Sequence, residues 1–241
     1  MARAVEILRA LGESPGGMTL VQIAEESGLP RSTVHRIVHT LQEANFVTAG
    51  ARGGGLRLGP ELARIAAVSR AQLVPLVRPF LEQLSRTVGQ GASLAILDGE
   101  NVRFLDQAVT GHGIRAISLV GSTFPAHCTA NGKALLAALD ESVVPTALPR
   151  RLPRLTRHTI TGRADLMAEL ERVRATGVAF DREEHAEGIC AVGRVIRDAV
   201  GNHAAITVAL PSQSFYGRED ELVAALTETT ERVNEVLAYA R

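Results

Sequence analysis

Two short stretches of the sequence, PAHC and EEHAEGIC, contain the side chains best suited to binding a metal ion or attacking a substrate. They supply His127, Cys128, His185 and Cys190, and imidazole and thiolate groups are common ligands of zinc. His127 and Cys128 are adjacent, so they cannot easily chelate one ion, and the pairs lack a compact Cys-x-x-Cys. Nucleophilic catalysis would need a base within hydrogen-bonding reach of a thiol, which nothing in the spacing predicts. The pattern favours structural roles, and we expect no metal site, no cofactor and no catalytic residue.

The acidic residues Asp181, Glu183 and Glu184 could serve acid–base chemistry, and Lys133, the only lysine, could act as an amine or bind phosphate. The alternative is a loop after a strand, in which Glu183 and Glu184 are solvated and one acid faces a ligand. We favour that alternative, and we expect Lys133 to make a surface or interface contact in the first turn of a helix. The glycine-rich GARGGG lacks the strand-loop-helix context of a phosphate cradle and is better interpreted as the tip of a hairpin.

The stretch GLPRSTVHRIVHTLQEANF, residues 28 to 46, has the spacing of an amphipathic helix. Val34, Ile37, Val38 and Leu41 recur on one face. The opposite face carries groups that reach base edges or phosphates when such a helix enters the major groove of DNA. The candidates for this contact at the start of the helix are Arg31, Ser32, Thr33, His35 and Arg36.

The surrounding elements fit a DNA-reading unit. Residues 1 to 45 predict three short helices, the second starting at a capping box of Thr19 and Gln22 and ending at Gly28. Pro30 is expected just inside the start of the third helix. Residues 46 to 59 then predict a strand, a glycine-rich turn and a strand, and Arg52 and Arg57 of this hairpin could touch the DNA backbone. We therefore predict a winged helix-turn-helix domain over residues 1 to 59.

The remainder of the chain predicts a linker helix and a larger domain. Residues 60 to 74 form a narrow apolar stripe typical of a linker or dimer contact, and Pro75 and Pro79 are expected to open a further helix. Strands and helices alternate over residues 75 to 241, with several neighbouring strands joined by short turns. This pattern predicts an α+β domain with a mostly antiparallel sheet.

Composition sets the limits on partners and compartment. The chain has 241 residues, with 26 Lys and Arg balancing 26 Asp and Glu, so a basic patch must be local. The first 59 residues hold six arginines against five glutamates, and a dimer would supply a second recognition helix. Two cysteines are too few for a disulfide scaffold, and no run is long enough to span a membrane. We expect a cytoplasmic protein.

Over its whole length, the sequence resembles the IclR family of transcriptional regulators. RAVEILRAL, LVQIAEESGLPRSTVHRIVHTLQ and LRLGPEL are similar to the N-terminal domain of the family in order and spacing. PAHCTANGKALLA, GVAFDREEHAEGICAVGRVIRD and AAITVALP resemble its effector domain. The resemblance implies a winged helix, a linker helix and a GAF-like effector domain over residues 75 to 241. It also implies a homodimer, in some members a dimer of dimers, that binds double-stranded operator DNA under the control of a small organic acid.

The resemblance also implies an effector pocket. The loop before the central helix of the effector domain would place Ala130 and Asn131 against the ligand, with backbone N–H groups near Gly132 at the helix start. A helix N-terminus favours an anion such as a carboxylate. Across the pocket, the acid that the family places there matches Asp181.

Other positions that match the pocket of the family carry different residues here. Ala191, Thr207 and Ala209 stand where hydroxyl or sulfur groups are common, and Cys190 is one residue before the matching cysteine. Because neighbours along a strand face opposite sides, Cys190 is expected to point away unless a bulge intervenes. Two alanines at these positions predict a roomier, more apolar pocket and a larger or partly aromatic acid.

Two other functions remain open from the sequence. One is an enzyme with a DNA-binding appendage that processes a small acid through Asp181 or His185. The other is an oligomerisation or protein-partner module with a degenerate helix-turn-helix. The identity of the effector, the operator and the sign of regulation do not follow from the residues.

Overall fold

The computed structural model describes residues 2–14, 16–50, 55–109, 119–197, 201 and 203–239, without the side chains of residues 66–71 and 239. Contacts within the chain divide it into two units, Met1–Gln72 and Leu73–Arg241. Arg52 lies outside the described residues.

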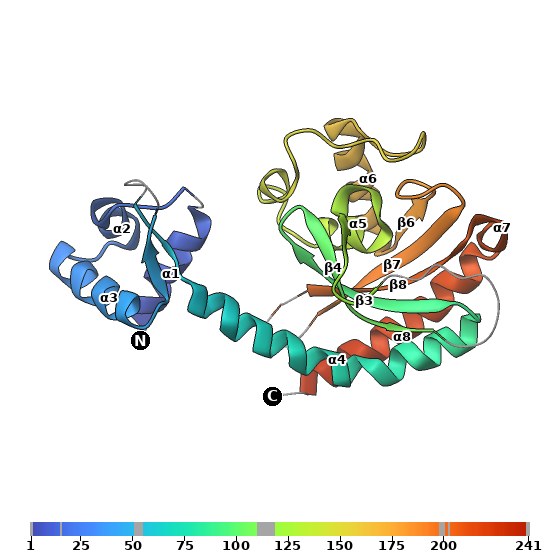
Figure 1. The fold of residues 1–241 in the computed structure, drawn as a ribbon, viewed down its shortest axis with the longest axis horizontal. Helices are drawn as coiled ribbons and strands as arrows, with labels where there is room; N and C mark the ends of the chain where they lie inside the picture. The colour runs from blue at the N-terminus through green and yellow to red at the C-terminus, as the bar shows by residue number, and fades with distance from the viewer. Residues whose placement is uncertain are drawn as a thin grey trace. The chain divides into compact units, whose positions relative to one another are not determined.

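The first unit is a winged helix-turn-helix (Figure 1). Its helices are α1 (Ala2–Glu13), α2 (Leu20–Ser27) and α3 (Arg31–Glu43), followed by the antiparallel strands β1 (Val47–Ala49) and β2 (Leu56–Leu58). The core of this unit combines residues of all three helices and β1, among them Ile7, Ile23, Val34, Val38 and Val47. The winged helix-turn-helix predicted from the sequence is thereby confirmed.

Local capping explains where α2 begins and ends. The Thr19 hydroxyl accepts a hydrogen bond from the Gln22 N–H at 3.3 Å, and Gln22 Oε1 accepts one from the Thr19 N–H at 2.8 Å, which completes the predicted capping box. Gly28 ends α2 with a φ of 63°, a conformation that costs glycine little. Pro30 precedes α3, which begins at Arg31, one residue later than expected.

A single helix, α4 (Pro60–Val88), replaces the two that the sequence predicted. The expectation that Pro75 would open a new helix is wrong, since α4 continues through both Pro75 and Pro79. A proline inside a helix removes one backbone hydrogen bond and crowds the preceding turn. Burial of Val77, Leu81 and Leu84 in the core of the second unit offsets this cost.

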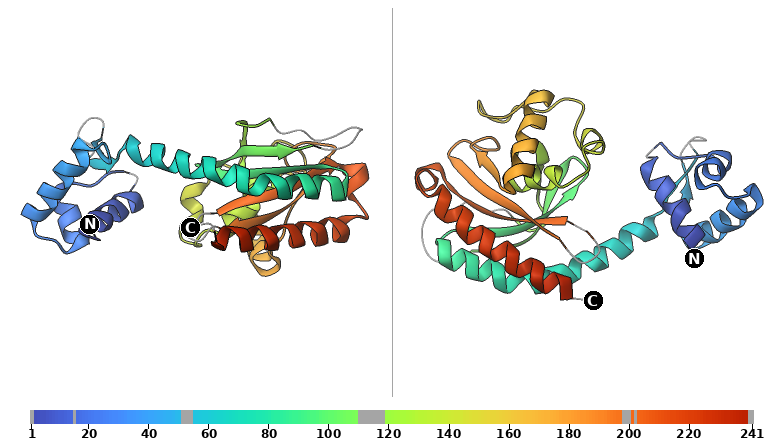
Figure 2. Two further views of the ribbon diagram at one scale, coloured as in Figure 1. Left: turned by 90° about the horizontal axis from the view of Figure 1, so that it is seen from below. Right: turned by 180° about the vertical axis from the view of Figure 1, so that it is seen from behind.

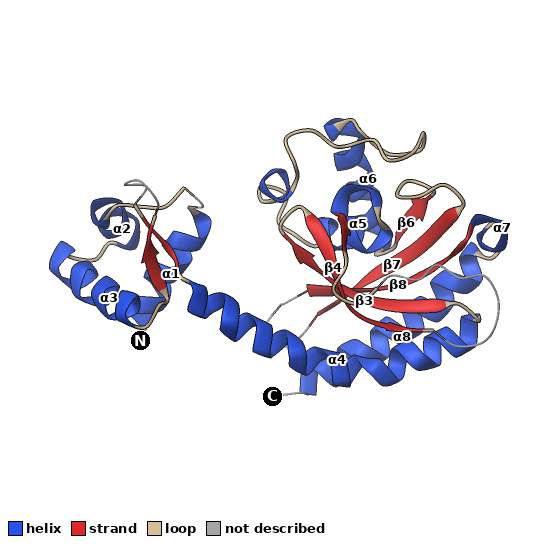
Figure 3. Cartoon of the chain, in the orientation of Figure 1, coloured by secondary structure: helices blue, strands red, loops and turns tan. Residues whose placement is uncertain are grey.

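The second unit is built on a six-stranded sheet with the order β5-β4-β3-β8-β7-β6 (Figure 3). Its neighbouring strands pair antiparallel, which confirms the predicted sheet. The strands are β3 (Gly91–Asp98), β4 (Asn101–Ala108), β5 (Thr123–Pro125), β6 (Ala179–Arg182), β7 (Ile189–Arg197) and β8 (His203–Pro211).

Helices cover both faces of this sheet. The part of α4 from Leu73 onward and α8 (Glu219–Tyr239) lie side by side on one face (Figure 2) and share its hydrophobic core. The other face packs against α5 (Ala130–Ala137) and α6 (Arg163–Thr176). The short helices are η2 (Ala126–Cys128), η3 (Val144–Ala147) and α7 (Ser212–Phe215). In the described part of the chain, no helix combines the length and the apolar character needed to cross a membrane.

Close packing of η2 against the start of α5 depends on a glycine. A Cβ atom added to Gly132 would lie 2.1 Å from the Ala126 carbonyl oxygen and 2.4 Å from its Cα, far inside contact distance. A Cβ added to Gly12, in α1, would meet only the Leu58 side chain, at 3.7 Å. Backbone therefore obstructs the methyl group at one helical glycine and not at the other.

We predict that Gly132→Ala lowers the thermal unfolding temperature of the protein, because η2 and α5 must move apart. Gly12→Ala is the matched control and should leave stability equal or raise it by about 0.5–1 kcal/mol through helix propensity. Thermal unfolding followed by circular dichroism makes the comparison. A Gly132→Ala protein as stable as the wild type would contradict this account of the packing.

Candidate functional site

Helix α3 has one buried and one exposed face, as its sequence predicted. Val34 and Val38 are 0% and 2% exposed and anchor the helix in the core of the first unit. The side chains predicted to contact DNA lie on the other side, where Arg31, Ser32, His35 and Arg36 are exposed and Thr33 is half-buried. The core thus fixes α3 in an orientation that leaves its hydroxyl, imidazole and guanidinium groups accessible.

One further arginine joins this surface, and sequence reasoning missed it. Arg3, Thr33, Arg36 and Ile37 line a hollow of about 450 Å³ between the start of α1 and α3. Arg3 precedes α3 by almost 30 residues, so helical spacing alone could not bring it there. The hollow therefore gathers two arginines and a hydroxyl on one side of the unit.

Arg57, in the wing, is exposed and braced by the α1–α2 loop. Its Nη2 donates a hydrogen bond to the Gly16 carbonyl oxygen at 3.1 Å. Its predicted contact with the DNA backbone stays a prediction, as does that of Arg52, which is outside the described residues.

The second unit contains a pocket of about 270 Å³ at the start of α5, on the α5 face of the sheet. The sequence-assigned residues that line it are Ala130, Asn131, Asp181, Ala191, Thr207 and Ala209. Gly193 lies in the same row of the sheet as Thr207, and a Cβ there would lie 3.0 Å from the Ala130 backbone. This small residue lets the start of α5 approach the strands and close one side of the pocket.

Cys190 and Gly132, two candidates for this pocket, do not line it, and strand alternation predicted this for Cys190 but not for Gly132. Cys190 is fully buried in the core between the sheet and α4 and α8, on the face opposite the pocket. Strand alternation, without a bulge, turns its thiol away while Ala191 lines the cavity. Gly132 packs against Ala126, and its N–H donates to the Thr129 hydroxyl at 3.3 Å and to Asn131 Oδ1 at 3.0 Å, so it is occupied within the protein.

Several lining residues were not assigned to the effector pocket from the sequence, although His185 was named there as a residue that could process an acid: Ser93, Phe104, Phe124, Thr129, His185, Ala186 and Ile189. Ser93 pairs directly with Thr207, so the strand pairing could have indicated it. The Phe124 ring meets Phe104 edge-on with centroids 5.1 Å apart and stacks on His185 at 4.3 Å. Burial lowers the pKa of His185, which favours a neutral imidazole. The aromatic wall, formed by two phenylalanine rings and a neutral imidazole, is thus uncharged near neutral pH.

Within the described part of the chain, two buried polar atoms of the pocket have no protein partner. Asn131 Nδ2 and Thr207 Oγ1 are buried, and neither makes a hydrogen bond to the described residues. Buried polar groups are normally hydrogen-bonded, because leaving one unpaired costs about 1–3 kcal/mol. An amide donor and a hydroxyl group are therefore available to a bound molecule.

Asp181 supplies the acid of the pocket and is only 4% exposed. Burial raises its pKa to about 7, and the nearby Glu184 carboxylate acts in the same direction. The N–H groups of Glu184 and His185 donate to Asp181 Oδ1 at 2.7 and 3.3 Å and, with Lys133, oppose the rise. Asp181 therefore changes its protonation near neutral pH.

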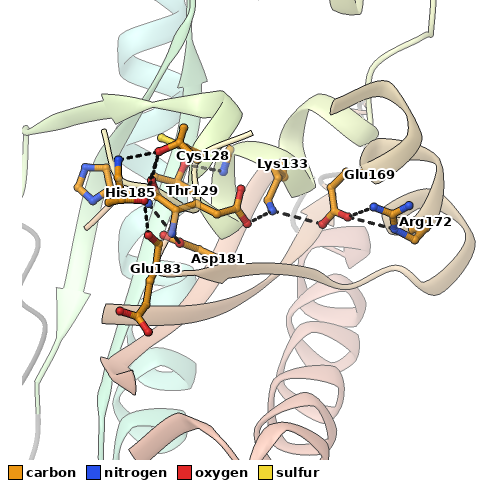
Figure 4. A network of polar contacts seen from close by, with 12 residues as sticks. Cys128, Thr129, Lys133, Glu169, Arg172, Asp181, Glu183 and His185 are labelled. Carbon is orange, nitrogen blue, oxygen red and sulfur yellow. Dashed lines mark hydrogen bonds and ion pairs between the residues drawn. The ribbon is translucent and has the colours of Figure 1, made fainter. Parts of the chain in front are cut away.

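Beside Asp181 lies a buried ion network (Figure 4). Lys133 is 1% exposed, and its Nζ lies 2.5 Å from Glu184 Oε1 and 3.3 Å from Glu169 Oε1. Arg172 pairs with Glu169 at 2.7 Å. The expectation of a surface or interface contact for Lys133 is wrong, because the side chain is buried within the unit, where two acids from α6 and the loop after β6 compensate its charge.

The expectation of a solvated loop also fails for Glu184, which is buried, with its carbonyl oxygen accepting from the Thr159 hydroxyl at 2.7 Å. Glu183 is half-buried, and its Oε2 accepts from the Gly188 N–H at 2.7 Å. Hydrogen bonds to other protein groups therefore hold the loop after β6.

The four histidine and cysteine side chains do not converge. His127 Nε2 lies 3.0 Å from the Pro153 carbonyl oxygen, and burial raises the pKa of the Cys128 thiol to about 12, which keeps it protonated. Within the described ranges there is no group of three or more His, Cys, Asp or Glu residues that could hold a metal ion.

Comparisons with known proteins agree with this two-part architecture. The family model described as IclR helix-turn-helix domain matches residues 1–50, and the model described as bacterial transcriptional regulator IclR C-terminal matches residues 65–235. The chain is 47% identical over 234 residues to the HTH-type transcriptional regulator Rv1719 of Mycobacterium tuberculosis, covering 97% of this chain and 90% of the relative. It is 36% identical to the regulator TtgV of Pseudomonas putida, covering 100% and 92%.

Solved structures are similar over almost the full length. The IclR protein of Thermotoga maritima superposes with a TM-score of 0.66 at 26% identity, covering 99% of this chain and 98% of that one. An IclR homologue of Microbacterium hydrocarbonoxydans complexed with 4-hydroxybenzoate gives a TM-score of 0.65 at 24% identity, covering 98% of each chain. The latter likeness shows the fold alone.

We predict that Lys133→Met destabilises the protein by about 3–5 kcal/mol, because it leaves the buried Glu184 carboxylate without its cation. Arg172→Ala is the control; that side chain is 67% exposed, and its loss should cost about 1 kcal/mol or less. Denaturant unfolding measures both. Equal stability of the two variants would show that the buried network contributes no more than a surface ion pair.

Asp181 should make stability depend on pH. The pKa of Asp181 is higher in the folded protein than in the unfolded chain. Its contribution to the free energy of unfolding is therefore fully present below the unfolded-state pKa and is lost as pH rises through about 7. Asp181→Asn removes the titrating group, and we expect the stability of the variant relative to the wild type to increase from about pH 5 to about pH 8. Unfolding measured across that range tests this, and a constant difference between the two proteins would contradict it.

Proposed function

The chain belongs to the IclR family of bacterial transcriptional regulators, and on that premise we propose that it binds operator DNA under the control of a small organic acid held in the α5 pocket. Residues 1–59 would bind the DNA, and residues 60–74 would form the helix that links them to the second domain. Residues 75–241 would bind the effector and form the homodimer or dimer of dimers. The observation that carries the proposal is the pairing of an exposed recognition face on α3 with a pocket that contains two unpartnered polar atoms.

The DNA-reading role rests on charge and accessibility. Arg31 and Arg36 are exposed on α3, and Arg3 lies in the same hollow as Arg36. Arginine can bridge the guanine acceptors of the major groove, and it also neutralises phosphates. The 59 residues carry little net positive charge, so a dimer that presents two helices to two half-sites supports affinity better than one copy.

The effector role rests on the chemistry of the pocket. Its volume of about 270 Å³ suits a small molecule, its aromatic wall suits an apolar body, and Asn131 and Thr207 suit a polar end. Such a ligand alters operator binding only through different affinities for two arrangements of the protein.

A mobility-shift assay tests the proposal directly. The full-length protein is mixed with DNA from upstream of its own gene at stated salt, with a panel of organic acids added. We expect specific binding that one acid releases or strengthens. Specific binding that no acid changes would remove the effector half of the proposal, and turnover of an acid would favour an enzyme instead.

We predict that Arg36→Ala weakens operator binding by about 1–3 kcal/mol if the guanidinium contacts a base, or lowers the salt dependence by about one unit if it contacts a phosphate. The control is Arg9→Ala, which removes an exposed arginine of α1 that lies among Glu6, Glu13 and Glu26. Binding is measured by fluorescence anisotropy at several salt concentrations. Unchanged binding by Arg36→Ala would exclude that residue from the interface.

A further inference from the structure

The described residues that line the α5 pocket include one carboxyl group, that of Asp181, and no lysine or arginine. His185 is the other titratable side chain, and its lowered pKa keeps the ring neutral. A carboxylate ligand would therefore meet an acid and no cation. Two carboxylates that share a desolvated site cannot both stay ionised, so one of them must take a proton.

The hydrogen-bonding groups indicate where that proton would reside. Asp181 Oδ1 accepts both N–H groups of the loop, from Glu184 and His185, so Oδ2 is not used in either bond. Asn131 Nδ2 and Thr207 Oγ1 can both donate, and neither has a partner among the residues that the structure describes. A protonated Asp181 would add a third donor to this set, which matches the acceptor-only character of a carboxylate.

We propose that the pocket binds an aryl carboxylate together with one proton, which Asp181 takes up from solvent and donates as a hydrogen bond to the ligand. The inference rests on the proposed function, because it specifies the protonation state in which the same pocket would hold its acid. The ligand carboxylate keeps its charge and accepts from Asp181, Asn131 and Thr207, while its ring lies against Phe104 and Phe124. No covalent bond forms or breaks apart from the protonation of Asp181.

The titratable groups around Asp181 are either engaged in other contacts or held protonated, so Asp181 is the group that takes up the proton. Lys133, on α5, is already engaged by Glu184 and Glu169, and Glu183 bonds the Gly188 N–H. Burial keeps the thiols of Cys128 on η2 and Cys190 on β7 protonated, because it raises both pKa values. Burial raises the pKa of Asp181 itself to about 7, so proton uptake falls within the physiological range.

Isothermal titration calorimetry tests the proposal with benzoate and benzyl alcohol as a matched charged and uncharged pair. Titrations in buffers of different ionisation enthalpy count the protons taken up on binding. For the wild type we expect benzoate to bind with uptake of about one proton at about pH 8 and of almost none at about pH 5.5. Its affinity should fall about tenfold per pH unit above about pH 7. Benzyl alcohol should bind more weakly than benzoate at about pH 5.5, without proton uptake.

Three variants separate the role of Asp181 from a merely structural one. Asp181→Asn keeps an oxygen for the loop N–H groups and places a permanent donor in the pocket, so its benzoate affinity should be independent of pH, with no proton uptake. Thr207→Val should weaken benzoate binding at every pH while the pH dependence persists. Glu187→Gln, which removes an exposed charge from the same loop, should behave as the wild type.

The proposal is overturned if benzoate binds the wild type without proton uptake at about pH 8, or if Asp181→Asn keeps the pH dependence of the wild type. It is equally overturned if benzyl alcohol binds as well as benzoate at about pH 5.5, or if benzoate does not bind at all. Operator binding, measured in parallel, separates the two claims. Intact operator binding with failed calorimetry rejects only this inference, and proton-linked benzoate binding without operator binding rejects only the regulator.

Discussion

The ion pair between Lys133 and Glu184 is the interaction on which the position of Asp181 in the α5 pocket depends. Lys133 lies on α5, Glu169 on α6 and Glu184 in the loop after β6. The buried ammonium group of Lys133 therefore connects three separate segments of the chain. A buried charge is tolerated only with such compensation. Fixing Glu184 also fixes Asp181, because the Glu184 N–H donates a hydrogen bond to Asp181 Oδ1. The Glu184 carbonyl oxygen in turn accepts a hydrogen bond from the Thr159 hydroxyl. The acid of the pocket is therefore positioned by a network outside the cavity.

Alternation along the sheet determines which side chains reach that pocket. Ala191, Thr207 and Ala209 face α5, while Cys190, Val208 and Leu210 fill the core against α4 and α8. Small residues at Gly193 and Gly132 let α5 and η2 approach, and the alanines keep space open behind them. The cavity follows from small side chains beside the helix start, and among the described residues Asn131 Nδ2 and Thr207 Oγ1 have no hydrogen-bond partner there.

Local patterns made the DNA-reading unit predictable. The capping box at Thr19, the left-handed turn at Gly28 and the apolar face of α3 each depend on residues within a few positions of one another. The same applies to Cys190, whose direction follows from its strand neighbours. The helix through Pro75 was not predictable, because tertiary burial of residues such as Val77 and Leu81 outweighs the local preference for a break.

Long-range pairing explains the other failures. Nothing near Lys133 in the sequence shows that Glu169 and Glu184 will surround it, 36 and 51 residues away, so a surface position was the natural expectation. Phe124 and His185 likewise become neighbours only when β5 and the loop after β6 meet at the pocket. Pocket residues that match the resemblance were predicted, whereas those that depend on packing between distant segments were missed.

The central claim is that the α5 pocket and the DNA-reading surface are energetically coupled in one IclR-family regulator. Thermodynamic linkage requires that an effector which changes operator affinity by some factor has its own affinity changed by the same factor when operator is bound. The most direct measurement is therefore the affinity of the pocket for an effector acid, taken with and without saturating operator DNA. The account predicts a shift equal to the effect of that acid on operator affinity. Identical effector affinity in both states would contradict it.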